Sequence, residues 1–195
     1  MMLNKYLNPL SNKIMKINLG SGIKKYDGFL NVDSDPSVNP DFLVDLELGL
    51  LPIDDNVVTE VKAYHILEHI GPNFFKMLQE LYRVCKNNAV IDVRVPHPRH
   101  DYFFGDPSHI RPITIEMMNR FSKKYNDLEK NNAGSTLFAY YYNVDFEIFH
   151  YEYIFEPYFL DMIKDKNDEE FNLMARLYNN VIQEIHFKMV VRKDD

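Results

Sequence analysis

The sequence predicts an α/β fold, with a mainly parallel β-sheet and an antiparallel pair of strands at its end. Three features of the chain lead to this prediction. Five short apolar runs are separated by helical or irregular segments in the first half of the chain. The earliest runs end at a glycine turn or at an acidic residue. Two long segments of alternating polarity follow near the C-terminus, and these suit neighbouring antiparallel strands.

Length and composition limit the class of protein. The 195 residues fit one domain over residues 1–195, with residues 1–15 as a polar lead-in that lacks the apolar segment of a secretory signal. No run approaches the ~20 apolar residues of a membrane span, so we expect no membrane association. Cys85 is the only cysteine, which excludes an internal disulfide and favours a reducing, cytoplasmic location. The formal charge of −7 gives no reason to expect nucleic acid as a partner.

Each element of the first half follows from a local pattern. The expected strands are Lys16–Leu19, Gly28–Asp33, Asp41–Glu47, Val61–His65 and Ala89–Pro96. Apolar residues recur at helical spacing over Asn73–Lys86, which predicts a helix between the last two strands. The order of these elements is that of strands joined by crossovers in a parallel sheet.

The second half begins with an irregular segment. His97–Thr114 holds three histidines and is expected to be a loop, and Thr114 can cap a helix that follows it. Apolar residues alternate over Asn143–Phe155 but change phase once, which predicts a β-bulge. After a helical connection at Tyr158–Tyr178, the segment Ile185–Val191 alternates again, as expected of a half-exposed strand.

Aromatic residues concentrate in Tyr140–Tyr142 and Phe146–Phe159. Such residues are compatible with an acceptor pocket, with the surface of a homodimer, or with a hairpin that packs on the core. We favour packing, because aromatic side chains are common in strands that cover a core.

Glycine, acidic and histidine residues stand at the carboxyl ends of the predicted strands, where open parallel sheets bind their ligands. These residues are Gly20, Ser21, Gly22, Asp33, Asp45, His65 and His97. A glycine turn lets backbone N–H groups approach a ligand closely. A carboxylate such as Asp33 can accept from both hydroxyls of a ribose, and Asp45 can accept from an adenine amino group.

The string "INLGSGIKKYDGFLNVD", followed by "DFLVDLELG", "AYHILEHI" and "VIDVRVPH", resembles the class I S-adenosylmethionine-dependent methyltransferases. The Asn-Leu-Gly-x-Gly opening and the Leu-Glu-His after the fourth strand are most similar to the type that acts on small molecules. The resemblance covers residues 16–114 and implies a Rossmann-like sheet of seven strands in the order 3-2-1-4-5-7-6, with the C-terminal antiparallel hairpin at one side. It also implies S-adenosyl-L-methionine as cofactor and a small-molecule acceptor.

The resemblance implies roles for particular residues. Asn18 and the turn Gly20-Ser21-Gly22 would lie beside the methionine part of the cofactor, Asp33 would hold the ribose, Asp45 and Leu46 would frame the adenine, and His65 would lie beside the sulfonium. Two features depart from the family pattern. Asn18 stands where many relatives have an acidic residue that binds the cofactor's amino group. Only ten residues separate Gly22 from Asp33, so we expect the first crossover helix to be reduced to about one turn.

Methyl transfer from a sulfonium is an in-line displacement, so the protein must position the partners and, where needed, remove a proton. The loop after the fifth strand is expected to supply the base. His97 directly follows the strand and is our first candidate, and His109 is the second. Alternatively, these histidines form hydrogen bonds within an irregular loop.

Other functions stay open. His65, Glu68 and His69 spell H-x-x-E-H, the signature of one class of zinc peptidase, but that use needs a helix and a third ligand. His97, His100, Asp101, Asp106 and His109 also have donor types suited to a metal, although their spacing matches no motif. We expect no metal. A further alternative is a protein that binds S-adenosylmethionine without transferring its methyl group, as a sensor or partner subunit.

Overall fold

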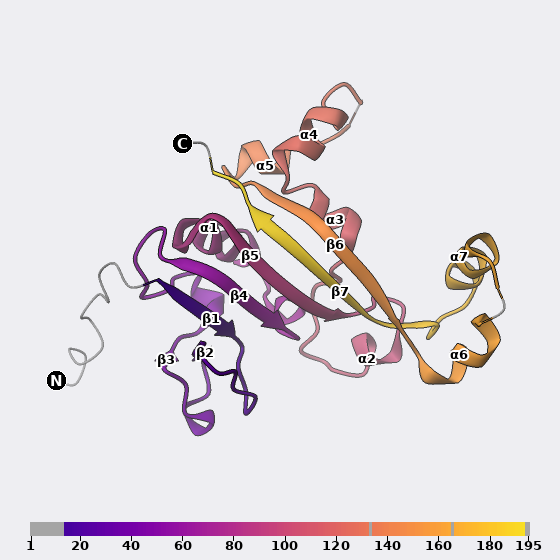
Figure 1. Ribbon diagram of the computed structural model, residues 1–195, viewed down its shortest axis with the longest axis horizontal. Coiled ribbons are helices and arrows are strands. Elements are labelled where there is room, and N and C mark those ends of the chain that lie inside the picture. The colour runs from indigo at the N-terminus through magenta and orange to yellow at the C-terminus, as the bar shows by residue number, and fades with distance from the viewer. Residues whose placement is uncertain (1–13, 133, 165, 194–195) are drawn as a thin grey trace.

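The computed structural model describes residues 14–132, 134–164 and 166–193. Helices lie between many of the strands along the chain, and four of the described α-helices stand between β5 and β6 (Figure 1). The strands are β1 (Met15–Leu19), β2 (Leu30–Asp33), β3 (Phe42–Leu43), β4 (Val58–Tyr64), β5 (Cys85–Pro96), β6 (Phe146–Phe155) and β7 (Ile182–Val191). The α-helices are α1 (Phe74–Val84), α2 (Asp101–Phe104), α3 (Ile115–Asn119), α4 (Lys123–Glu129), α5 (Phe138–Tyr141), α6 (Pro157–Ile163) and α7 (Asp168–Leu177). Three 3₁₀-helices are η1 (Pro36–Val38), η2 (Leu46–Leu48) and η3 (Leu67–His69).

The strands form one seven-stranded sheet in the order β3-β2-β1-β4-β5-β7-β6. The first five strands are parallel, and β7 is antiparallel to both β5 and β6. The predicted strand order and the terminal hairpin are therefore confirmed. The register between β6 and β7 shifts between Ile148 and His150, which confirms the bulge that the change of phase predicted.

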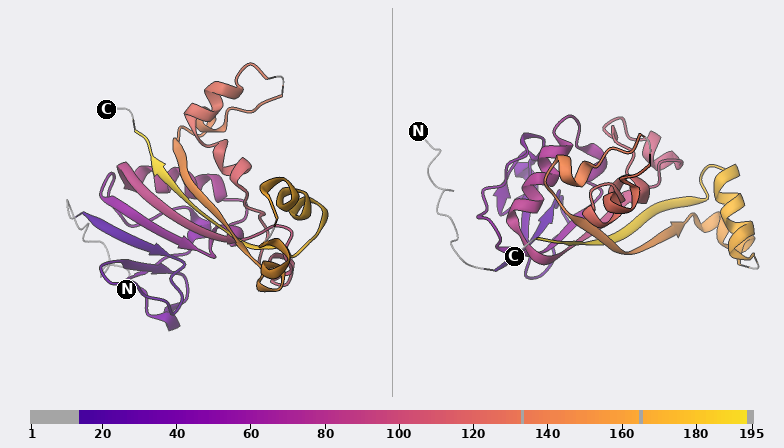
Figure 2. Two further views of the ribbon diagram at one scale, coloured as in Figure 1. Left: turned by 45° about the vertical axis from the view of Figure 1, so that its right-hand side comes forward. Right: turned by 90° about the horizontal axis from the view of Figure 1, so that it is seen from above.

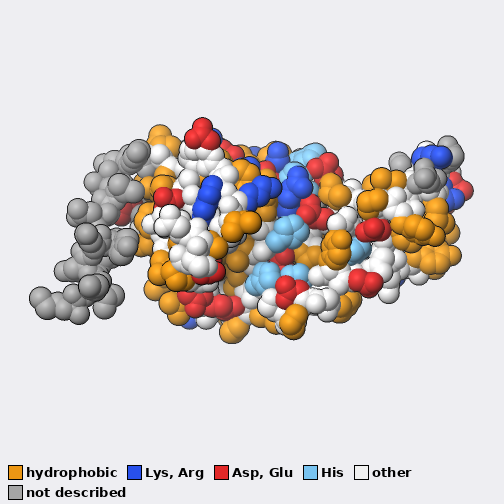
Figure 3. All heavy atoms as spheres, turned by 90° about the horizontal axis from the view of Figure 1, so that it is seen from below, with side chains coloured by type: hydrophobic (Ala, Val, Ile, Leu, Met, Phe, Trp, Pro, Cys, Tyr) orange, Lys and Arg blue, Asp and Glu red, His pale blue; other side chains and the backbone are white. Residues whose placement is uncertain are grey.

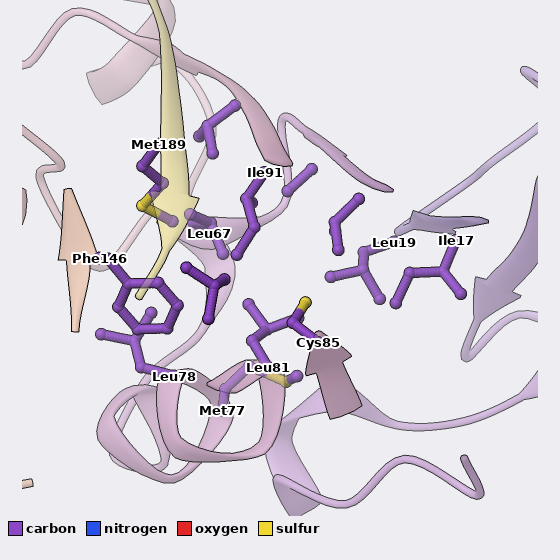
Figure 4. Packing of buried hydrophobic residues seen from close by; sticks show 14 of the residues in the cluster. Ile17, Leu19, Leu67, Met77, Leu78, Leu81, Cys85, Ile91, Phe146 and Met189 are labelled. Carbon is purple, nitrogen blue, oxygen red and sulfur yellow. The ribbon is translucent and has the colours of Figure 1, made fainter. Parts of the chain in front are cut away.

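One face of the sheet carries the hydrophobic core. The helix α1 packs against it through Phe74, Met77, Leu78, Leu81 and Val84, each no more than 1% exposed. These side chains meet apolar residues of β1, β5, β6 and β7, some of which Figure 4 shows in contact with α1. Burial of side chains of this size contributes about 1.5–3 kcal/mol each, so this layer provides much of the stability of the fold.

The opposite face of the sheet is polar. Tyr64 donates to Asp92 (2.9 Å), His186 lies 2.7 Å from the same carboxylate, and Lys62 lies 3.8 Å from it. Figure 2 shows the sheet edge-on in its right-hand view, with α1 and α3 on one side of it. The same views show α6 and α7 at the far end of the β6–β7 hairpin, away from the rest of the chain. Within the described residues the sheet is thus covered by helices mainly on one face.

Several predicted elements differ in extent. The strand expected over Asp41–Glu47 stops at Leu43, because the side chain of Asp45 accepts from the Glu47 N–H and starts η2 instead. The single helix expected after Thr114 is two helices, since Ser122 caps α4 by accepting from the Tyr125 N–H. The cap at Thr114 is present, and it accepts from the Met117 N–H.

The crossover from β1 to β2 has turns and no helix, which is shorter than the one turn that we expected. Of the lead-in predicted for residues 1–15, residues 1–13 lie outside the described part of the chain, and Met15 already belongs to β1. None of the helices in the described ranges is long and apolar enough to cross a membrane.

Candidate functional site

Two neighbouring cavities open where the parallel strands end. The first cavity, of about 420 Å³, lies beyond the ends of β1 and β4. Its lining residues are Asn18, Gly20, Ser21, Lys24, Tyr26, Tyr64, His65, Arg94 and Glu184. Four of them, Asn18, Gly20, Ser21 and His65, belong to the predicted cofactor site. Figure 3 shows histidine and charged side chains gathered near the middle of this side of the molecule.

The glycine turn after β1 has two distinct glycines. Gly20 has a φ of 57°, and a Cβ atom there would lie 2.7 Å from the Ile66 side chain. Gly22 has a φ of 47°, but a Cβ atom there would meet nothing within 4 Å. Gly20 is therefore required for packing as well as conformation, whereas Gly22 borders open space.

Asp33 holds this turn against the end of β2. Its Oδ2 accepts from the Gly22 N–H (2.7 Å), and its Oδ1 accepts from the Asp35 N–H (3.0 Å). Both oxygens therefore already have a backbone partner, although each retains a further lone pair. Asp33 does not line the first cavity, so the structure places it behind the turn, where it positions the backbone.

Asn18 is almost fully buried at the base of the first cavity. Its side-chain amide donates to the Lys24 carbonyl (2.9 Å) and to Asn31 Oδ1 (3.1 Å). Both amide protons are thus used within the protein. Its Oδ1 is left as an acceptor, the role that an acidic residue would fill at this position.

Two buried donors at the first cavity have no hydrogen-bond partner in the described part of the chain. They are the Tyr26 hydroxyl and the Arg94 Nε. A buried donor without a partner costs about 1–3 kcal/mol, so such groups are usually satisfied by a ligand or by water. With the ammonium group of Lys24, they give this cavity a set of donors suited to an anionic group.

His65 directly follows β4 and has a φ of 53°, a left-handed conformation that is uncommon for residues other than glycine. Its Nε2 lies 2.8 Å from Glu184 Oε2, and its Nδ1 lies 3.5 Å from Glu68 Oε1. These two carboxylates raise the pKa of His65 to about 9, so the imidazole is protonated at neutral pH. Glu184 also pairs with Arg94 at 3.1 Å.

The second cavity, of about 210 Å³, shares His65 and Glu184 with the first. Its other lining residues are Pro96, Tyr102, His109 and Gln183. The His65–Glu184 pair therefore stands between the two cavities. His109 Nδ1 lies 3.1 Å from the Phe103 carbonyl, which fixes the ring at the cavity wall.

His97, our first candidate for the base, lines neither cavity. Its Nδ1 accepts from the Arg99 N–H (3.2 Å), and its ring packs edge-on against Tyr153. Burial, followed by the nearby charges of Arg99 and His100, lowers the pKa of His97 to about 4. The structure brings His109 to the site and leaves His97 beside it.

Asp45 and Leu46 also lie away from the first cavity. Leu46 is 6% exposed and belongs to the core. Asp45 borders a larger cavity of about 800 Å³ between β3 and α1, which is lined mainly by apolar side chains. This cavity is larger than the other two, but the glycine turn and the histidines do not line it, so we assign the chemistry to the two smaller cavities.

The residues of the H-x-x-E-H motif do not lie together on one helix, as the zinc-peptidase use of this motif would need. Only Leu67–His69 is helical, as one 3₁₀ turn, so His65 and His69 do not share a helix. His65 faces Glu184, Glu68 is fully buried, and His69 lies 3.0 Å from the Ser108 hydroxyl. The second set of donor residues, considered as an alternative, does not assemble either, because His100 pairs with Glu156 at 3.1 Å instead.

No protein-family model matches the chain, and no curated protein sequence matches it significantly. Several solved structures, in contrast, are similar to the structure of this chain. A SAM-dependent methyltransferase from Archaeoglobus fulgidus has a TM-score of 0.57 and 16% identity, covering 96% of this chain and 90% of that chain. Phosphoethanolamine N-methyltransferase 2 from Haemonchus contortus, in complex with S-adenosyl-L-methionine, has a TM-score of 0.51 and 11% identity, covering 97% and 51%.

The chain has the class I methyltransferase fold. The order of the strands in the sheet and the antiparallel C-terminal hairpin agree with those that the resemblance implied. The [4+2]-cyclase SpnF is also similar, with a TM-score of 0.54 and 16% identity over 95% of this chain and 78% of that chain. A shared fold therefore does not determine the reaction, which must be argued from the site.

Five residues of the first cavity were missed by reasoning from the sequence: Lys24, Tyr26, Tyr64, Arg94 and Glu184. Glu184 reaches the site because β7 pairs with β5 and brings it opposite Pro96. Arg94 stands out in the sequence as a charge inside an apolar strand, and this signal was available. Tyr26 lies in a turn with no regular pattern, so the sequence offered no such signal.

Proposed function

We propose that the protein is an S-adenosylmethionine-dependent methyltransferase, with the cofactor in the first cavity and the acceptor in the second. The observation that carries this proposal is the position of the two cavities, on either side of the His65–Glu184 pair at the ligand-binding edge of a methyltransferase fold. In-line transfer requires donor and acceptor on opposite sides of one methyl group, and adjacent cavities meet that requirement.

The chemistry of the first cavity supports an amino-acid group as its ligand. Lys24, Arg94 and the Tyr26 hydroxyl can donate to a carboxylate. Asn18 Oδ1 and Glu184 can accept from an ammonium group. The methionine part of S-adenosylmethionine carries both groups, so its zwitterion matches the donors and acceptors of this cavity.

The same placement makes Gly20, Ser21 and Asn18 the residues nearest the methionine part, and His65 the residue nearest the methyl group. Gly22 and Asp33 support the ribose indirectly, through the bond that holds the turn. The adenine contacts expected of Asp45 and Leu46 have no support from the cavity lining.

The second cavity supports a small acceptor. Its volume of about 210 Å³ holds a small molecule or one end of a larger one. Of the two predicted bases, His109 lines this cavity, and we therefore rank it before His97. A cytoplasmic location and a homodimer remain predictions from the sequence.

Transfer of tritium from methyl-labelled S-adenosylmethionine to a metabolite extract tests the proposal. We expect a labelled small molecule to form with the wild-type protein and to decrease strongly with Arg94→Leu, which removes a donor to the carboxylate. His150→Ala is the matched control, because His150 is exposed on β6 away from both cavities. Binding of the cofactor without any transfer would favour the non-catalytic alternative, and absence of binding would reject both.

A further inference from the structure

Three donor side chains outside the proposed cofactor site lie close together. Glu68 and His69 belong to η3, and His109 lies in the loop between α2 and α3. One donor atom from each of the three residues lies within 4.8 Å of the other two. The backbone holds them there, because the Glu68 carbonyl accepts from the N–H groups of Ile110 (3.0 Å) and Arg111 (3.1 Å).

Glu68 is the unusual member of this cluster. It is 0% exposed, yet neither carboxylate oxygen has a hydrogen-bond partner among the described residues. The ring nitrogens that lie near it are His65 Nδ1 at 3.5 Å and His109 Nε2 at 3.9 Å. A buried carboxylate without hydrogen bonds costs several kcal/mol, so the site is incomplete without a further positive partner.

The two histidines are oriented as metal ligands are. A carbonyl can only accept, so His109 Nδ1 donates to Phe103, and in the neutral ring the lone pair is on Nε2, which lies 3.9 Å from Glu68 Oε1 and 3.8 Å from Asp106 Oδ2. The Ser108 hydroxyl donates its one proton to Asp106 at 2.5 Å, so it accepts from His69 Nδ1 at 3.0 Å. Each ring thus has Nδ1–H bound to a partner and Nε2 available, as is typical of histidines that bind metals.

We propose that Glu68, His69 and His109 bind a divalent first-row transition metal ion beside the second cavity. Two imidazoles and one carboxylate are a ligand set of catalytic zinc sites, which keep a further position open. Magnesium and calcium prefer oxygen ligands, so this nitrogen-rich set disfavours them. His65, the first histidine of the H-x-x-E-H motif, does not belong to this group of donor atoms.

If the proposed methyl transfer is correct, the metal also defines the class of acceptor. His109 lines the second cavity, so the open position of the metal would face the acceptor. A metal-bound hydroxyl has a lowered pKa and releases its proton to water. The resulting oxygen then forms the new O–CH₃ bond while the S–CH₃ bond breaks, and the electron pair stays on sulfur. The acceptor would therefore be an alcohol or another oxygen nucleophile, and His109 would act as a ligand rather than as the base.

Titration of the chelator-treated 195-residue chain with Zn²⁺, followed by calorimetry, tests the metal site without requiring methyl transfer. We expect one Zn²⁺ per chain, no competition by an excess of Mg²⁺, and visible absorption bands when Co²⁺ replaces Zn²⁺. Glu68→Gln and His69→Ala should abolish the binding, and His150→Ala should leave it unchanged. Ser108→Ala, which removes the partner of His69, should weaken it about 10–100-fold.

Circular dichroism of each variant shows whether it is folded. His69 is only half-buried, so His69→Ala keeps the test valid even if Glu68→Gln does not fold. No Zn²⁺ bound to folded wild-type protein would overturn the proposal, and so would binding that survives in folded Glu68→Gln or His69→Ala. Zinc binding in a protein that does not bind S-adenosylmethionine would leave the metal site established and would reject only the proposed methyl transfer.

Discussion

Replacement of Gly20 by alanine tests the geometry of the turn that builds the first cavity. Two costs add at this position. The φ of 57° places a non-glycine residue in the left-handed region, which costs about 1–2 kcal/mol. The new Cβ atom would also lie 2.7 Å from the side chain of Ile66, and overpacking of this kind costs about 1–3 kcal/mol. We therefore expect Gly20→Ala to lower the free energy of unfolding by about 2–5 kcal/mol.

Gly22→Ala is the matched control, because its φ of 47° is similar but its Cβ atom meets nothing within 4 Å. It should lose only the conformational part, about 1–2 kcal/mol. Urea denaturation followed by circular dichroism measures both values. In a double-mutant cycle, Ile66→Ala should remove much of the extra cost at Gly20. Equal losses for the two alanine variants, or no coupling with Ile66→Ala, would refute this explanation of the turn.

Three further predictions concern groups around the site. Burial, Arg99 and His100 lower the pKa of His97 to about 4, so the NMR titration midpoint of this histidine should lie near pH 4, and a midpoint near 6.5 would contradict the assigned environment. Because the unfolded chain binds this proton more tightly, the free energy of unfolding should decrease as the pH falls from about 6.5 through 4. Burial raises the pKa of Cys85 to about 12, so iodoacetamide should not modify this thiol at pH 8 until the protein unfolds, and rapid modification of the native protein would show that the core is open. Tyr64→Phe removes the hydrogen bond to Asp92 and should cost about 1 kcal/mol in the free energy of unfolding, measured by urea denaturation; an unchanged value would mean that the bond contributes nothing.

Local patterns were sufficient for most of the fold. The phase change near Phe149 predicted the bulge, and helical spacing predicted α1 to within a few residues. The errors occurred where side chains bind the backbone locally. Asp45 and Ser122 each start a new turn by accepting from a nearby N–H, and periodicity does not detect such competition.

The site was less predictable than the fold, because strand pairing and loop docking decide its composition. The position of His65 after β4 was predictable from the sequence, but its contact with Glu184 depends on the register between β5 and β7. The choice between His97 and His109 could not be made from spacing either. His109 reaches the second cavity because the loop that carries it is bonded to the Glu68 carbonyl, 41 residues before His109 in the chain.

Calorimetric titration with S-adenosylhomocysteine tests the central claim most directly, because it measures occupation of the first cavity without requiring an acceptor. We predict one ligand per chain for the wild-type protein and for His150→Ala. Arg94→Leu should weaken the binding by about tenfold or more, since a hydrogen bond to a charged group contributes about 1.5–3 kcal/mol. Absence of binding to folded wild-type protein, or equal binding to Arg94→Leu, would contradict the assignment of this cavity to the cofactor.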